Sequence, residues 1–98
     1  MTELDVVCYT AFDGWNCQVI VSDDDGTRTE HSVSVTRTER ARYGPNSDVH
    51  MLVNASFRFL LSHEPKESIL RSFALSDIER YFPDYASAVT TRLGSQPE

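Results

Sequence analysis

The sequence lacks the segments that would place this chain in a membrane. None of its apolar runs approaches the roughly eighteen residues that a membrane-spanning helix needs. Its start, MTELDVV, has neither the cationic beginning nor the apolar stretch of a secretory signal peptide. We therefore expect a cytoplasmic protein that does not contact membranes.

Cysteine and glycine are scarce, and neither residue type forms a recognisable site. Cys8 and Cys17 are the only cysteines, and without a secretion signal they are expected to be reduced core residues. They show no paired ligand spacing with His31, His50 or His63, as a zinc site would require. The four glycines fall at turns or helix ends, so no phosphate-binding loop is present. The sequence predicts no metal and no cofactor.

The acidic run VSDDDG suggests a calcium loop, but its spacing fails. With Gly26 at the invariant glycine, Val21 would take the first ligand position and Ser32 the position of the bidentate glutamate. We interpret these acids as turn residues instead.

The charge is strongly asymmetric along the chain. The formal net charge is −6, and residues 1–25 hold six acidic side chains and no basic one. A negative surface repels phosphate backbones, which makes general nucleic-acid binding unlikely. The apolar fraction of 40% is that of an ordinary globular protein, and the length predicts a single domain over residues 1–94 with a loose tail at 95–98.

Three alternating segments, LDVVCYTAF, WNCQVIVS and TRTEHSVSV, predict a three-stranded antiparallel meander. A two-residue turn at Asp13-Gly14 would place Cys8 opposite Val19. In that register Cys8 and Cys17 lie diagonally on one face, which predicts free thiols.

The second turn allows two registers, of which only one keeps the apolar side chains on one face. A three-residue loop, residues 24–26, with Gly26 in the left-handed conformation pairs Cys17 with Val33 and Val19 with His31. This register places His31 on the inner face, where a hydrogen-bonded core histidine is the expected role.

The rest of the chain predicts three or four helices, and hence an α+β fold with the helices chiefly on one sheet face. Thr36 and Glu39 have capping-box spacing ahead of a short helix, and Asn46 or Ser47 could cap a central helix. The central helix carries an apolar stripe at Val49, Leu52, Val53, Ser56, Phe57 and Leu60. Pro65 predicts a further helix with Ile69, Leu70 and Phe73 on one side, followed by a capping box at Ser76 and a last helix after Pro83.

The segments ASFRFLL, EPKESILRSF and IERYFP, with the DY that follows, resemble a group of small bacterial proteins of about this length. The resemblance covers nearly a third of the chain closely. It implies a small domain in a bacterial cytoplasm, and it supplies no catalytic residue.

The segment from His63 to Ser68 is the most reactive-looking stretch. His63 as base, Ser68 as nucleophile and Lys66 as activator would need to lie within hydrogen-bond reach of one another, which the spacing does not guarantee. An elbow between two helices explains the same residues, with Pro65 opening the second. We prefer the elbow and do not expect an enzyme.

Two surfaces could bind a partner. Arg28, Arg37, Arg40 and Arg42 could hold an anion or an acidic partner, although Glu30 and Glu39 are interspersed and no aromatic platform is expected. On the outer sheet face, Val7, Tyr9 and Ile20 form a small apolar patch. We therefore predict an interaction or regulatory protein that forms a homodimer or binds a protein partner, with catalysis at residues 63–68 and nucleic-acid binding as alternatives.

Overall fold

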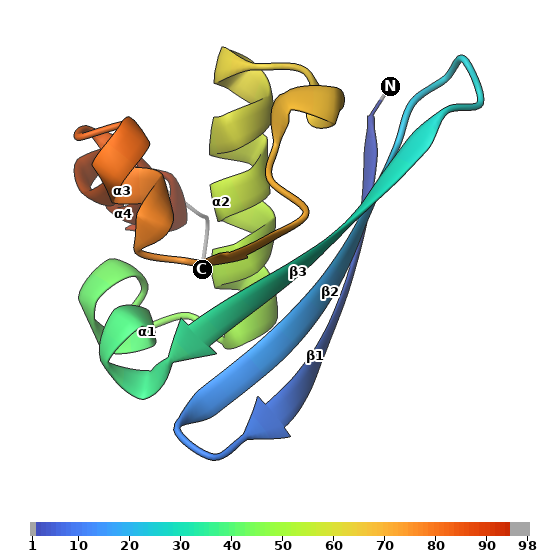
Figure 1. Cartoon of the computed structure of the whole chain (residues 1–98). Coiled ribbons are helices and arrows are strands. Elements are labelled where there is room, and N and C mark those ends of the chain that lie inside the picture. Colours follow the sequence, from blue (N-terminus) through green and yellow to red (C-terminus); the bar gives the residue numbers. More distant parts are fainter. Residues whose placement is uncertain (1, 95–98) are drawn as a thin grey trace.

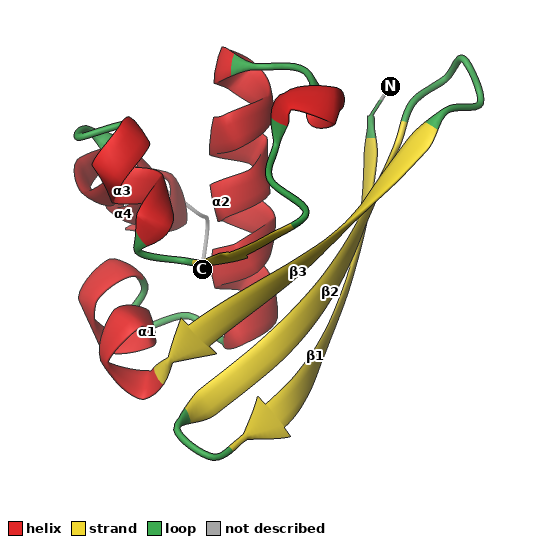
Figure 2. Ribbon diagram, viewed as in Figure 1, coloured by secondary structure: helices red, strands yellow, loops and turns green. Residues whose placement is uncertain are grey.

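The computed structural model describes residues 2–94 and has the predicted α+β architecture. Four α-helices lie on one face of a four-stranded sheet whose strand order is β1-β2-β3-β4 (Figures 1 and 2). The elements are β1 Glu3–Ala11, β2 Gly14–Ser22, β3 Arg28–Thr36, α1 Arg37–Tyr43, α2 Val49–His63, a 3₁₀ turn Lys66–Ser68, β4 Ser72–Ala74, α3 Asp77–Tyr81 and α4 Tyr85–Gly94. No helix within this range is both long and apolar enough to cross a bilayer. The predicted tail at 95–98 lies outside the described residues.

The first hairpin turns one residue earlier than predicted. Its two loop residues are Phe12 and Asp13, and Gly14 already belongs to β2, opposite Ala11. A Cβ on Gly14 would lie 2.0 Å from the carbonyl oxygen of Val35, so glycine is needed where β3 passes close by. Gly14 therefore serves strand packing, and the apolar Phe12 is left fully exposed at the hairpin tip.

This shift places Cys8 directly opposite Cys17, and the two form a disulfide. The prediction of free thiols was wrong because it rested on a register displaced by two residues, with Val19 opposite Cys8. A displacement of two keeps every side chain on its face, so the predicted inner and outer faces are unaffected.

The second hairpin has the predicted register. Cys17 faces Val33 and Val19 faces His31. The loop closes through a hydrogen bond from the Asp23 N–H to the Thr27 carbonyl and another from the Gly26 N–H to the Asp23 carbonyl. Gly26 has a φ of 86°, which is the left-handed conformation that the prediction required.

The fourth strand was not predicted, and it replaces the helix expected after Pro65. Residues 66–68 form a single 3₁₀ turn, and the chain then runs extended into β4, which is parallel to β3 and pairs Phe73 with Val33. Phe73 thus joins the core from a strand, while Leu70 points to solvent with 52% of its surface exposed.

The helix caps agree with the sequence in one case of three. The capping box of Thr36 and Glu39 is complete, and both of its hydrogen bonds are made. The central helix α2 is capped by Asp48, whose carboxylate accepts from the Met51 N–H, and not by Asn46 or Ser47. Ser76 makes no side-chain cap for α3.

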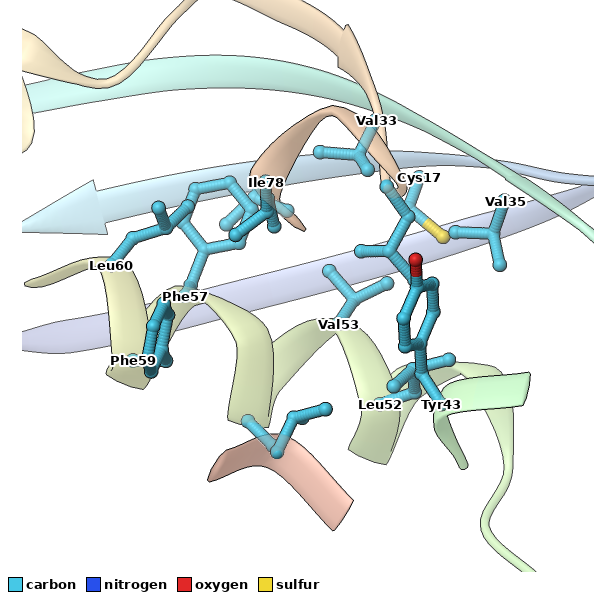
Figure 3. Packing of buried hydrophobic residues seen from close by; sticks show 14 of the residues in the cluster. Cys17, Val33, Val35, Tyr43, Leu52, Val53, Phe57, Phe59, Leu60 and Ile78 are labelled. Carbon is cyan, nitrogen blue, oxygen red and sulfur yellow. The ribbon is translucent and has the colours of Figure 1, made fainter. Parts of the chain in front are cut away.

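The hydrophobic core lies between α2 and the inner face of the sheet, as Figure 3 shows. The whole predicted stripe of α2 is buried, and the strands contribute Cys17, Val19, Val33 and Val35 from the opposite side. Tyr85 of α4 is also fully buried; its ring centroid lies 4.9 Å from that of Tyr43, which ends α1. The core therefore covers one face of the sheet, and no helix among residues 2–94 covers the other.

Candidate functional site

Among residues 2–94, no helix covers the outer face of the sheet (Figure 2). Val7 and Tyr9 of β1 keep 42% and 60% of their surfaces exposed there. In the observed register Val7 lies opposite Gln18, and Ile20 lies opposite Asp5. The three predicted interface residues thus share the outer face. The predicted register paired Val7 directly with Ile20, whereas in the structure the two are diagonal neighbours.

The strand that carries Val7 and Tyr9 is also an edge of the sheet. β1 pairs with β2 on one side only, and its nine residues run without a bulge in the pairing. Of the devices that prevent edge strands from pairing with other chains, it has no proline and no lysine, and its only charged side chains are Glu3 and Asp5 near its start. The exposed apolar side chains and the free backbone groups therefore occur on the same strand.

The residues proposed as a catalytic cluster are not brought together. His63 ends α2 with its ring stacked on Phe82 at a centroid distance of 4.9 Å and close to Phe59 at 4.6 Å. No hydrogen bond within residues 2–94 joins His63 to Ser68. His63 is positioned by aromatic packing, and within the described residues it is not joined to Ser68 as base to nucleophile.

Lys66, the activator in the catalytic alternative, makes ion pairs that the sequence did not reveal. Only 4% of it is exposed, and its ammonium donates to Asp23 Oδ2 at 2.5 Å and to Thr27 Oγ1 at 2.7 Å. A further ion pair joins it to Glu67 at 2.7 Å, so all three of its protons have acceptors. Lys66 ties the segment after α2 to the loop between β2 and β3.

These contacts shift the pKa values of the groups involved. The hydrogen bond from Lys66 is the main cause that lowers the pKa of Asp23, with a second bond from Thr2. The same ammonium lowers the pKa of Glu67, and the two carboxylates raise the pKa of Lys66. Every group is held in its charged form, which suits an ion-pair lock and not an acid or base that must exchange protons near neutrality.

His31 is a core residue, as predicted. Its exposed fraction is 2%, and Nδ1 lies 2.8 Å from the carbonyl oxygen of Leu70. A carbonyl only accepts, so Nδ1 donates its proton there, and Nε2 lies 2.7 Å from Thr29 Oγ1. The Nδ1 contact therefore attaches the segment around Leu70 to β3, whereas the Nε2 contact stays within β3.

The four arginines do not form one patch. Arg28 begins β3, while Arg37, Arg40 and Arg42 lie on α1, which follows the other end of that strand (Figure 1). Arg42 pairs with Glu79 at 3.0 Å.

Two of these arginines have an aromatic partner that the sequence did not lead us to expect. The guanidinium carbons of Arg37 and Arg40 lie 5.7 and 5.9 Å from the ring centroid of Trp15. Trp15 is the second residue of β2, and the sheet register brings it beside α1 although more than twenty residues separate it from Arg37 in the sequence.

Two hollows complete the candidate sites. One, of about 540 Å³, lies between the start of β1 and α2 and includes His50 and Arg58. The other, of about 380 Å³, lies between the end of α2, the following segment and α3, and it includes Ser68. Among residues 2–94, no group of three or more His, Cys, Asp or Glu side chains is placed to hold a metal ion.

Comparisons with protein-family models, with curated proteins and with solved structures find no match. Function must therefore be argued from the surfaces themselves.

Proposed function

We propose that this chain is a non-enzymatic interaction protein that self-associates by pairing the free edge of β1 with β1 of a second copy. The observation that carries the proposal is a nine-residue edge with two exposed apolar side chains, no proline, no bulge, and charged residues only at its start, Glu3 and Asp5. Edge strands of this kind readily pair with another chain unless charge, proline or a bulge prevents it. Two-fold dimers are the commonest form of self-association.

The geometry of the first hairpin fixes which peptide groups are free. Ala11 and Gly14 close a two-residue loop and therefore form a hydrogen-bonded pair. Pairing alternates along an antiparallel ladder, so the odd-numbered residues of β1 bond to β2. The N–H and C=O groups of the even-numbered residues, Leu4, Val6, Cys8 and Thr10, point to the free edge.

An antiparallel β1–β1 contact centred on Val7 uses the whole strand. Val7 then meets Val7 of the second copy, and Tyr9 meets Asp5 of the second copy. No two carboxylates face one another, because Glu3 falls opposite Ala11 of the second copy. This register joins the exposed apolar side chains of both copies on the outer face, with Ile20 beside Asp5 in the adjoining row.

Light scattering of the purified protein tests the proposal. The expected species has twice the 11.1 kDa mass of the chain. Val7→Asp places two like charges directly opposite each other on the two-fold axis and should yield monomer. Ser34→Asp is the matched control, since it adds the same charge to the outer face on β3, away from the edge. A wild type that is monomeric at all concentrations would refute the proposal.

A second variant separates edge pairing from stacking of the outer faces. Tyr9→Lys removes the most exposed aromatic side chain of the patch but places a cation opposite Asp5 of the second copy. Edge pairing predicts that this dimer persists and becomes sensitive to salt, whereas face stacking predicts that it dissociates.

The alternative functions have less support. Catalysis at residues 63–68 would need contacts between His63 and Ser68 that residues 2–94 do not make. Nucleic-acid binding gains a possible stacking platform at Trp15, but its ring is already beside Arg37 and Arg40. It predicts salt-sensitive retardation that weakens in the double variant Arg40→Ala, Arg42→Ala.

The resemblance to small bacterial proteins implies a bacterial cytoplasm. Disulfides persist mainly in oxidising compartments, so the Cys8–Cys17 bond favours an oxidising compartment over the expected location.

A further inference from the structure

The groove between the end of α2 and α3 has the composition of a small-molecule site. Its volume is about 380 Å³, within the range of 300 to 1,000 Å³ that is common for ligand pockets. Leu60, Ile69 and Ile78 lie deepest, each with no more than 5% of its surface exposed. Leu70 and Tyr81 stand at the margin and are 52% and 70% exposed.

The local fold explains why this space is open. The chain leaves α2 at His63 and is held toward the β2–β3 loop by the ion pairs of Lys66. It returns along β3 only at β4, and α3 begins three residues later. The chain between the end of α2 and the start of α3 therefore takes a detour along the sheet, and the groove lies beside that detour.

The charge of the lining restricts the ligand. Glu64 and Asp77 are the only ionisable acids or bases among the lining side chains apart from the Tyr81 phenol, and both are carboxylates. The Glu64 carboxylate is half-buried and makes no ion pair or hydrogen bond with any of residues 2–94. Asp77 accepts from the Ala74 N–H at 3.1 Å and lies 3.8 Å from the guanidinium of Arg80, which is largely in water.

We propose that this groove binds a small organic cation with an apolar body, such as a primary amine on an alkyl or aromatic group. The apolar portion would occupy the space over Ile69 and Ile78, and the ammonium would lie at the margin between the Glu64 and Asp77 carboxylates. A ligand of opposite charge would meet two carboxylates and no base in the lining, in a chain whose net charge is −6.

The site is independent of the proposed dimer. The strand order places β1 at one edge of the sheet and β4 at the other, and the groove adjoins β4 on the helical side. Ligand binding and self-association can therefore be tested separately in the same protein.

Titration of ¹⁵N-labelled full-length protein with octylammonium and with octanoate tests the proposal, because the two probes share a chain and differ in charge. Octylammonium should shift the amide signals of residues 60–82 in a saturable way, and octanoate should bind at least about tenfold more weakly, which corresponds to about 1.4 kcal/mol. Equal or tighter binding of octanoate would overturn the proposal, as would shifts confined to other surfaces or no saturable binding at all.

Two variants locate the site. Glu64→Gln removes a carboxylate that holds no structural partner within residues 2–94, and it should weaken octylammonium binding about two- to fivefold, as expected for a partly exposed ion pair. Glu30→Gln makes the same change on the outer sheet face and should have no effect. Ser68→Phe should fill the groove and abolish binding. Unchanged affinity in Glu64→Gln and Ser68→Phe would refute the assignment.

Discussion

Reduction of the Cys8–Cys17 disulfide should lower the free energy of unfolding by an amount that depends on the length of the loop that the bond closes. The bond joins residues nine apart in the sequence. For a loop of this length, the loss of chain entropy in the unfolded state corresponds to about 2.6 kcal/mol at 25 °C. Reduction leaves both side chains in place, so the comparison includes no change in core composition.

Urea denaturation with and without a phosphine reductant measures this difference. A denaturant slope of about 1–3 kcal/mol/M converts 2.6 kcal/mol into a midpoint shift of about 1–2.5 M urea. The corresponding fall in melting temperature is about 10–20 °C for a chain of this size. The native fold should survive, because the register of β1 against β2 is also set by the inner-face side chains.

The control is the double variant Cys8→Ala, Cys17→Ala, whose midpoint should not respond to the reductant. Two alkylatable thiols in the denatured protein, purified without reductant, would show that the bond does not form. Equal midpoints for the oxidised and reduced wild type would refute the entropic reasoning even if the bond is present.

Two further predictions concern buried polar contacts. The Ser56 hydroxyl donates to the Leu52 carbonyl at 2.7 Å, so the buried Tyr85 hydroxyl must donate to Ser56 Oγ at 2.6 Å. Ser56→Ala would leave the Tyr85 hydroxyl without a partner and should lower the free energy of unfolding by about 1–3 kcal/mol, whereas Tyr85→Phe should lower it by about 1 kcal/mol. If the effects of the two variants were additive in the double variant, the contact would be contradicted. At Lys66, the lowered pKa values of Asp23 and Glu67 stabilise the fold above the unfolded carboxyl range, and this contribution is lost as pH falls below about 4.5. In Lys66→Met, the free energy of unfolding should fall less steeply with decreasing pH below about 4.5 than it does in the wild type. An equally steep fall in the variant would contradict a stabilising role for the ion pairs of Lys66.

The two hairpins show what hydrophobic patterning can and cannot determine. In the second hairpin the alternative register would have crossed the faces, so the pattern alone selected Cys17 opposite Val33. In the first hairpin the competing registers differ by two residues and leave every face intact. Gly14 decides between them through its close approach to Val35 in a third strand, and a contact of that kind cannot be read from the hairpin sequence.

The segment after α2 could not be predicted for a related reason. Pro65 and the apolar residues that follow are compatible with a helix, but local propensity is a weak constraint over so few residues. The backbone instead satisfies its hydrogen bonds against β3, and Lys66 finds its carboxylate forty-three residues earlier in the chain. The β3 strand and Asp23 are both distant from this segment in the sequence. The groove between α2 and α3, which depends on these contacts, therefore could not be predicted either.

The two edges of the sheet determine how far self-association can proceed. On the β3 side, β4 covers residues 32–34, and the Ser32 N–H donates to the Arg71 carbonyl, so only a short and interrupted edge remains. On the other side β1 presents nine continuous residues. A contact between two β1 strands is isologous and uses the free edge of both copies, so nothing of similar length remains for a third chain. The asymmetry of the sheet therefore predicts a closed dimer and argues against open-ended assembly through strand pairing.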